Sequence, residues 1–95
     1  MRYFHRSNVA PDVALAEADR FFSSYVPVER GERERTFSGP AGRISVRVAM
    51  EGGHYTRITA ETDQVGESEA DKLVKRFLAV LHRREEPGYE VRGAY

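Results

Sequence analysis

The sequence predicts a small α+β domain in which two helices pack on one face of an antiparallel sheet of three to five strands. Apolar and polar residues alternate through Gly42–Met50 and again through Tyr55–Asp63, which indicates a β-hairpin. Apolar residues recur every three or four positions through Pro11–Tyr25 and again after Gly66, which indicates two amphipathic helices. The expected order is a strand, a helix, three strands and a helix, with a terminal strand as an option.

The composition fits one soluble domain spanning residues 1–95. Hydrophobic residues make up 40% and charged residues 32% of the chain, as in ordinary globular proteins. Fifteen basic and fifteen acidic residues give a formal net charge of zero, so the chain lacks the positive field that draws proteins to nucleic acids and anionic membranes. We therefore regard nucleic acid as disfavoured and expect no membrane partner. A cytoplasmic location is expected, because no signal-peptide pattern or membrane-length apolar run occurs.

The N-terminal segment is expected to form a strand and then a helix. Arg2–Asn8 is predicted to be a short strand with Tyr3 and His5 on the same face. Pro11 suits the first turn of a helix, because it lacks the N–H that would have no partner there. The helix is expected to reach Tyr25. Its apolar stripe comprises Ala14, Leu15, Ala18, Phe21, Phe22 and Tyr25, with Glu17, Asp19 and Arg20 outside it.

A mixed-charge run, Glu29–Arg35, separates this helix from the hairpin. Its second half, continued by Thr36 and Phe37, is expected to form an edge strand, because charged residues protect an unpaired edge. A solvated loop is the alternative. The glycines and proline of Ser38–Gly42 then indicate a turn.

The hairpin turn determines which residues face each other. A two-residue loop at Gly52 and Gly53 would place Val48 opposite Arg57 and mix the two faces. A three-residue loop with a glycine in the left-handed conformation places Val48 opposite Ile58 and keeps the apolar residues together. We therefore predict the three-residue loop.

The final helix has both a start signal and a stop signal. Ser68 is expected to cap it, with Asp71 three residues later as the acidic counterpart of a capping box, and Pro87 to end it. Its apolar stripe comprises Ala70, Leu73, Val74, Phe77, Leu78 and Leu81. Residues 85–95 form a tail that is either flexible or pairs with a partner.

The order of these elements resembles one repeat of the TATA-binding-protein type of fold. The long final helix after antiparallel strands also resembles the helix-grip proteins that bind lipids. No motif in the sequence assigns the chain to either family.

No segment carries a catalytic, metal or phosphate-binding motif, so we expect no enzyme activity and no cofactor. The chain has no cysteine, and His5, His54 and His82 lack the spacing of a metal site, so each is expected at the surface or in a capping position. Basic and aromatic residues nevertheless suggest an interaction surface, either a phosphate-binding one or a solvated, salt-bridged one. Its candidates are Arg47, Tyr55, Arg57 and Thr59 on the hairpin and Lys72, Lys75 and Arg76 on the final helix.

The leading hypothesis is a small non-catalytic domain that associates with itself as a dimer, through a sheet edge or the polar face of the sheet. The candidate edge is the C-terminal segment carrying Tyr89, Val91 and Tyr95. The alternative is a module that binds a small apolar ligand between the helices and the sheet. Its pocket would be lined by Phe4, Phe21, Phe22, Phe37, Phe77 and Tyr25, which could equally be the core itself.

Overall fold

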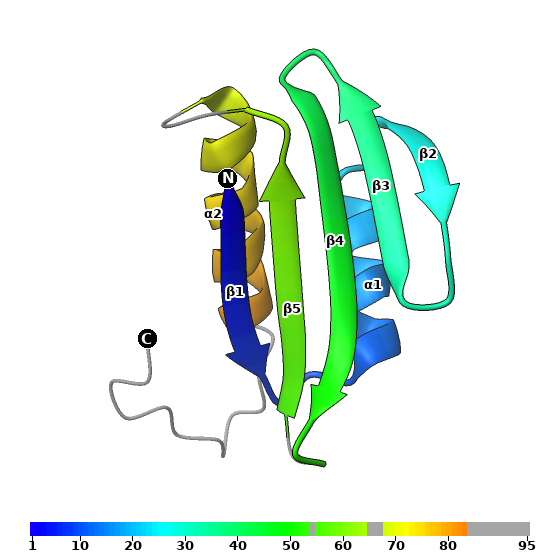
Figure 1. Cartoon of the computed structure of the whole chain (residues 1–95), viewed down its shortest axis with the longest axis vertical. Coiled ribbons are helices and arrows are strands. Elements are labelled where there is room, and N and C mark those ends of the chain that lie inside the picture. Colours follow the sequence, from blue (N-terminus) through cyan, green and yellow to red (C-terminus); the bar gives the residue numbers. More distant parts are fainter. Residues whose placement is uncertain (54, 65–67, 84–95) are drawn as a thin grey trace.

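The computed structural model describes residues 1–53, 55–64 and 68–83. A single antiparallel sheet forms one layer, and two helices lie side by side behind it (Figure 1). The α+β class, the antiparallel sheet and the packing of both helices on one face are therefore confirmed. The elements are β1 (Arg2–Ser7), α1 (Pro11–Phe21), β2 (Val26–Arg30), β3 (Glu34–Gly39), β4 (Gly42–Glu51), β5 (Tyr55–Thr62) and α2 (Glu69–Arg83).

The strands lie in the order β1-β5-β4-β3-β2, so the first strand of the chain pairs with the last one described. Strand β2 adds one strand to the expected series between the helices. It pairs with β3 and takes the outer position, so β3 is an interior strand and not the edge that its charges suggested. Every residue of β2 is exposed, as suits a strand with one neighbour and no helix over it.

Helix α1 ends at Phe21, four residues before the predicted end at Tyr25. The N–H of Phe22 still donates to the carbonyl of Ala18, but the N–H of Ser23 donates to that of Arg20 and the chain turns away. Phe22 is nevertheless buried, and Tyr25 is half-buried. The apolar residues therefore continue beyond the end of α1, because Phe22 and Tyr25 lie in the turn that follows the helix and still pack against the core.

The β4–β5 register is the predicted one. Val48 pairs with Ile58, and Val46 pairs with Ala60. Three residues separate Glu51 from Tyr55, and Gly52 and Gly53 have φ values of +64° and +74°. Both glycines therefore occupy the left-handed region that other residues avoid. The larger loop keeps the buried residues of both strands on one face.

The core lies between the helices and the sheet face that they cover. Phe22 is at its centre, and its ring centroid lies 5.1 Å from that of Phe37 and 5.5 Å from that of Phe77. The largest side chains with almost no exposed surface also include Ile44, Ile58, Leu81, Val46 and Val74. Five of the aromatic residues proposed as a pocket lining thus pack in or against the core, whereas Phe4 lies on the opposite face of the sheet and is 53% exposed.

Two burial predictions were wrong. Glu17 was expected outside the apolar stripe of α1, yet it is only 6% exposed, and its carboxylate pairs with Arg20 at 3.5 Å. His5 was expected at the surface or in a capping position but is 8% exposed, because its strand position places it on the face that α2 covers. Its ring lies 6.3 Å from the ring of the exposed His82, edge to face. The apolar stripe of α2 is confirmed, with Ala70, Val74, Phe77 and Leu81 buried.

Candidate interaction surface

The sheet has a second face, which we call the outer face, on the side away from the helices. Within the described residues, no helix covers it (Figure 1). The strand registers align its members across four strands. They are Arg2, Phe4 and Arg6 on β1, Tyr55, Arg57, Thr59 and Glu61 on β5, Arg43, Ser45, Arg47, Ala49 and Glu51 on β4, and Glu34, Thr36 and Ser38 on β3.

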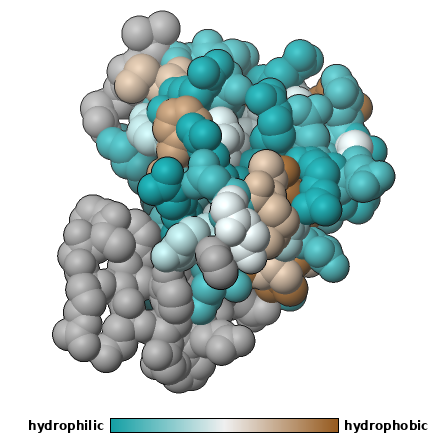
Figure 2. All heavy atoms as spheres, turned by 60° about the horizontal axis from the view of Figure 1, so that its bottom comes forward, coloured by the Kyte–Doolittle hydropathy of each residue, from teal (hydrophilic) through white to brown (hydrophobic). Residues whose placement is uncertain are grey.

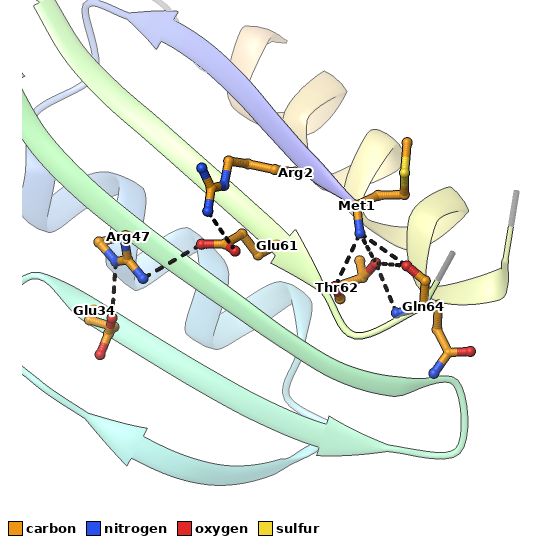
Figure 3. Close-up of polar contacts among 7 residues, drawn as sticks. All are labelled: Met1, Arg2, Glu34, Arg47, Glu61, Thr62 and Gln64. Atoms are coloured by element: carbon orange, nitrogen blue, oxygen red, sulfur yellow. Dashed lines mark hydrogen bonds and ion pairs between the residues drawn. The ribbon is translucent and has the colours of Figure 1, made fainter. Parts of the chain in front are cut away.

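A chain of ion pairs, the first ionic row, crosses the outer face from β1 to β3 (Figure 3). Glu61 accepts from Arg2 at 3.3 Å and lies 3.6 Å from Arg47, whose Nε donates to Glu34 at 3.0 Å. The arginine side chains are more than half exposed. Exposed pairs of this kind contribute at most about 1 kcal/mol each. The row therefore organises the charges of the surface more than it stabilises the fold.

The second ionic row centres on Glu51. Its carboxylate accepts from Arg6 and lies 3.6 Å from Arg57. The Arg57 guanidinium also stands 4.4 Å from the centre of the Phe4 ring, within the range of a cation–π contact. Arg2, Arg6, Arg47 and Arg57 thus each have a carboxylate partner on another strand.

Two exposed aromatic residues interrupt this charged surface. Phe4 is 53% exposed and lies between Arg2 and Arg6 on β1, and Tyr55 is 40% exposed at the start of β5. Aromatic residues are enriched in protein–protein interfaces relative to the rest of the surface, so these two rings make the outer face a candidate contact surface.

The structure divides the seven predicted surface residues between two sides of the molecule. Those on the hairpin, Arg47, Tyr55, Arg57 and Thr59, belong to the outer face. Those on the final helix, Lys72, Lys75 and Arg76, lie on α2, which packs against the other face of the sheet. Sequence periodicity places residues on a face of their own element but does not show which side of the sheet the helix covers.

We call the exposed cations of α2, Lys72, Lys75, Arg76 and Arg83, the basic ridge. Lys72 lies 3.6 Å from Glu69, and the ammonium of Lys75 lies 5.8 Å from the centre of the Tyr3 ring. Arg76 and Arg83 have no carboxylate partner among residues 1–53, 55–64 and 68–83. The two sides of the molecule therefore differ in how far their positive charges are neutralised.

A buried carboxylate connects α2 to the sheet. Asp71 has no exposed surface, and its Oδ1 accepts from the Tyr3 hydroxyl at 3.0 Å and from the Thr62 hydroxyl at 3.1 Å. Its Oδ2 accepts from the N–H of Ser68 at 3.2 Å and from the Ser68 hydroxyl at 2.6 Å. The N–H of Asp71 donates to Ser68 Oγ in return, which confirms the predicted capping box. The contacts to Tyr3 and Thr62 were not predicted.

Burial alone raises the pKa of Asp71, but the hydrogen bonds from Ser68, Tyr3 and Thr62 outweigh it and hold the pKa below its ordinary value. The carboxylate is therefore ionised at neutral pH with its lone pairs occupied. Such a group connects the start of α2 to β1 and to the end of β5.

Other conventional sites are not found in the described residues. No three histidine or acidic side chains there are placed to hold a metal ion, and no helix there is long and apolar enough to cross a membrane. An open hollow of about 190 Å³ lies between the start of α1 and the β2–β3 turn, lined by Pro11, Asp12, Leu15, Glu32 and Arg33. Two acids and an arginine in so small a lining do not suit an apolar ligand.

Hydrophilic residues also cover most of the end of the molecule at the β4–β5 turn, where Figure 2 shows a narrow apolar strip among them. Exposed apolar residues of the elements that meet at this end include Met50 and Val13. The candidate dimer-edge residues Tyr89, Val91 and Tyr95, and also His54, lie outside the described residues.

Comparisons with known proteins do not assign the chain to a family, because no family model, curated protein or solved structure matches it significantly.

Proposed function

We propose that this chain is a non-catalytic interaction domain that forms a homodimer through the outer face of its sheet. The observation that carries the proposal is an open sheet face on which Phe4, 53% exposed, lies between two ionic rows. An aromatic anchor within a polar surround is the usual arrangement of a protein–protein contact.

The charges of the outer face support a partner identical to itself. In a two-fold dimer the same patch meets itself, so a surface of one sign would repel its copy. Here Arg2 and Arg47 alternate with Glu61 and Glu34 along the first row. Rotating one copy against the other can therefore bring arginines opposite glutamates.

The size of the face favours a dimer of modest affinity. With strands about 4.8 Å apart and about seven residues long on average, the five-stranded sheet has a face of roughly 19 by 23 Å, or about 440 Å². Stable interfaces bury about 800 Å² on each partner, so this contact is at the low end. We expect a dimer that dissociates on dilution.

The exposed edge of β2 is less suited to self-association. Pro27 has no N–H to donate, and the pairing register shifts between Pro27 and Glu29. A proline and a bulge are devices that prevent the addition of another strand. The outer face is the better candidate among the described surfaces.

Sedimentation velocity over a wide concentration range tests the proposal. We expect wild type to shift from monomer to dimer as concentration rises, and Phe4→Glu to remain monomeric. Val13→Glu is the matched control, because Val13 is an apolar residue 40% exposed on α1, on the other side of the sheet. Circular dichroism verifies that both variants fold.

Wild type that stays monomeric throughout, or Phe4→Glu that dimerises as well as wild type, would refute the proposal. Deletion of residues 85–95 distinguishes a dimer formed through the outer face from one formed through the C-terminal tail. If that deletion abolishes the dimer and Phe4→Glu does not, the tail is the contact.

A further inference from the structure

The basic ridge of α2 gathers four cationic side chains on a chain whose formal net charge is zero. Along the solvent side of this helix, four cations accompany one exposed acid, Glu69. Glu69 lies near Lys72, whereas Arg76 and Arg83 have no carboxylate partner in the described part of the chain. On the outer face, by contrast, Arg47 and Arg57 each face a glutamate. A net charge of zero therefore conceals a local excess.

The composition of the ridge indicates what kind of partner it fits. Protein–protein contacts use aromatic and apolar anchors at their centre and are depleted of lysine. The residue between the cations of the ridge is Ala79, and no large apolar side chain of α2 is among the exposed ones. A surface that offers charge without apolar area suits a partner that also binds through charge.

The spacing of the ridge matches a dense linear polyanion. Lys72 and Arg83 are eleven residues apart, which corresponds to about 16 Å along a helix. Each strand of a nucleic-acid duplex presents one phosphate charge for about every 3.4 Å of the duplex axis, so this length spans about five phosphates of one strand. Four cations distributed over that length can each approach a phosphate.

We propose that the basic ridge binds the phosphate backbone of a nucleic-acid duplex without reading its sequence. The ridge offers lysine and arginine side chains, which contact phosphates without reading base identity, and Phe77, the phenylalanine of α2, is completely buried and cannot stack on bases. This site is on the side of the sheet opposite the outer face. It stands whether or not the outer face forms a dimer.

Fluorescence anisotropy with a labelled, arbitrary-sequence DNA duplex, titrated with the full chain at several salt concentrations, tests the site. Four phosphate contacts predict a slope of log affinity against log salt of about −3.6, or a loss of roughly 150-fold between 50 and 200 mM salt. In Arg76→Gln/Arg83→Gln, two contacts remain and the slope falls to about −1.8.

The matched control is Arg30→Gln/Arg33→Gln, which removes the same charge from exposed positions on β2 and its turn. We expect this control to bind as wild type does. Equal weakening in both double variants would mean that overall charge acts and not the ridge, and would overturn the proposal. Absence of salt-dependent binding at low salt would overturn it too.

Competition identifies the partner class. We expect unlabelled duplex to displace the probe, and poly-glutamate at the same total charge to displace it poorly. Equally effective displacement by poly-glutamate would overturn the nucleic-acid assignment in favour of an acidic protein segment. Repeating the titration with Phe4→Glu separates the two proposals, because the ridge should bind duplex with its salt dependence retained even if that variant does not dimerise.

Discussion

The two ends of the sheet are held by different means. At the β1 end, α2 covers the strands, Asp71 connects β1 and β5 to the helix, and Ser7 on β1 has no exposed surface. At the β2 end every residue of the strand is exposed, and the contacts of Asp19 with Arg30 and Arg35 are ion pairs at 3.4 and 3.2 Å. The comparison teaches that burial and satisfied polar groups are concentrated at one end, so local stability should be uneven.

The largest effect should follow from removing core volume beneath α2. Phe77 is completely buried and contacts the rings of both Phe21 and Phe22. We expect Phe77→Ala to lower the free energy of unfolding by about 3–5 kcal/mol, because the cavity cannot close fully. Urea denaturation measures it. A loss no larger than that of an exposed β2 variant would contradict the comparison.

Asp71→Ala should be next in size. It leaves the Tyr3 and Thr62 hydroxyls and the Ser68 N–H without their acceptor in a buried place. We expect a loss of about 2–4 kcal/mol in the free energy of unfolding. The same denaturation experiment tests it, with Asp19→Ala at the β2 end as the matched control. Similar losses in the two variants would show that the two ends are not anchored differently.

Asp71 also predicts a dependence of stability on pH. Its pKa is lower in the folded chain than the ordinary 3.8, so the unfolded chain binds the proton more readily. Its contribution is complete above about pH 4 and is lost as pH falls through the folded pKa. In Asp71→Asn the decline in stability below pH 4 should be shallower than in wild type. An equally steep decline would assign it to other carboxylates.

Asp63 is the comparison group for that titration. The side-chain amide of Gln64 and the N–H of Arg43 lower its pKa, but it is exposed at the end of β5. Solvent screening should make Asp63→Asn change the acid profile less than Asp71→Asn.

Two glycines provide a further test, Gly39 on β3 near the β2 end and Gly53 in the β4–β5 turn. A Cβ at Gly39 would lie 2.5 Å from ring atoms of Tyr25, whereas a Cβ at Gly53 meets nothing within 4 Å. We expect Gly39→Ala to cost about 1–3 kcal/mol through displacement of that ring. Gly53→Ala should cost about 1 kcal/mol from its positive φ alone. Thermal unfolding of the two variants decides. A smaller loss in Gly39→Ala would show that Tyr25 moves aside freely.

The smallest effect is expected in β2 itself. Val28 is 45% exposed, so Val28→Ala should change the free energy of unfolding by less than about 0.5 kcal/mol. Native-state hydrogen exchange provides the complementary measurement. Amides of β2 should exchange well before those of β5, which lies between two strands. Equal protection of the two strands would remove the proposed difference between the ends.

The hairpin and the start of α2 could be predicted from the sequence because their determinants are local. Alternation of side chains and the length of one turn specify that Val48 faces Ile58. The spacing of Ser68 and Asp71 specifies the cap. In both cases every residue that decides the structure lies within about twenty positions of its partner.

What could not be predicted depends on partners distant in the sequence. The segment Val26-Pro27-Val28 is short and contains a proline, so its sequence pattern does not indicate a strand. It forms β2 because it pairs with β3. Nothing near Asp71 in the sequence indicates that Tyr3, 68 residues away, donates to it. The available signal was the position of Asp71, a small polar residue at the border of the apolar stripe of α2, where a buried side chain needs hydrogen-bond partners.

The pairing of β1 with β5 has a consequence for how the chain folds. Arg2 faces Glu61 and Ser7 faces Thr56, so the first strand has its sheet partner about fifty residues further along. During synthesis this N-terminal strand must wait, unpaired, until the hairpin has left the ribosome, whereas β3 and β4 can pair as soon as they emerge. Contacts between residues so far apart in sequence slow folding. We therefore expect the docking of β1 against β5 to be a late step in the folding of this domain.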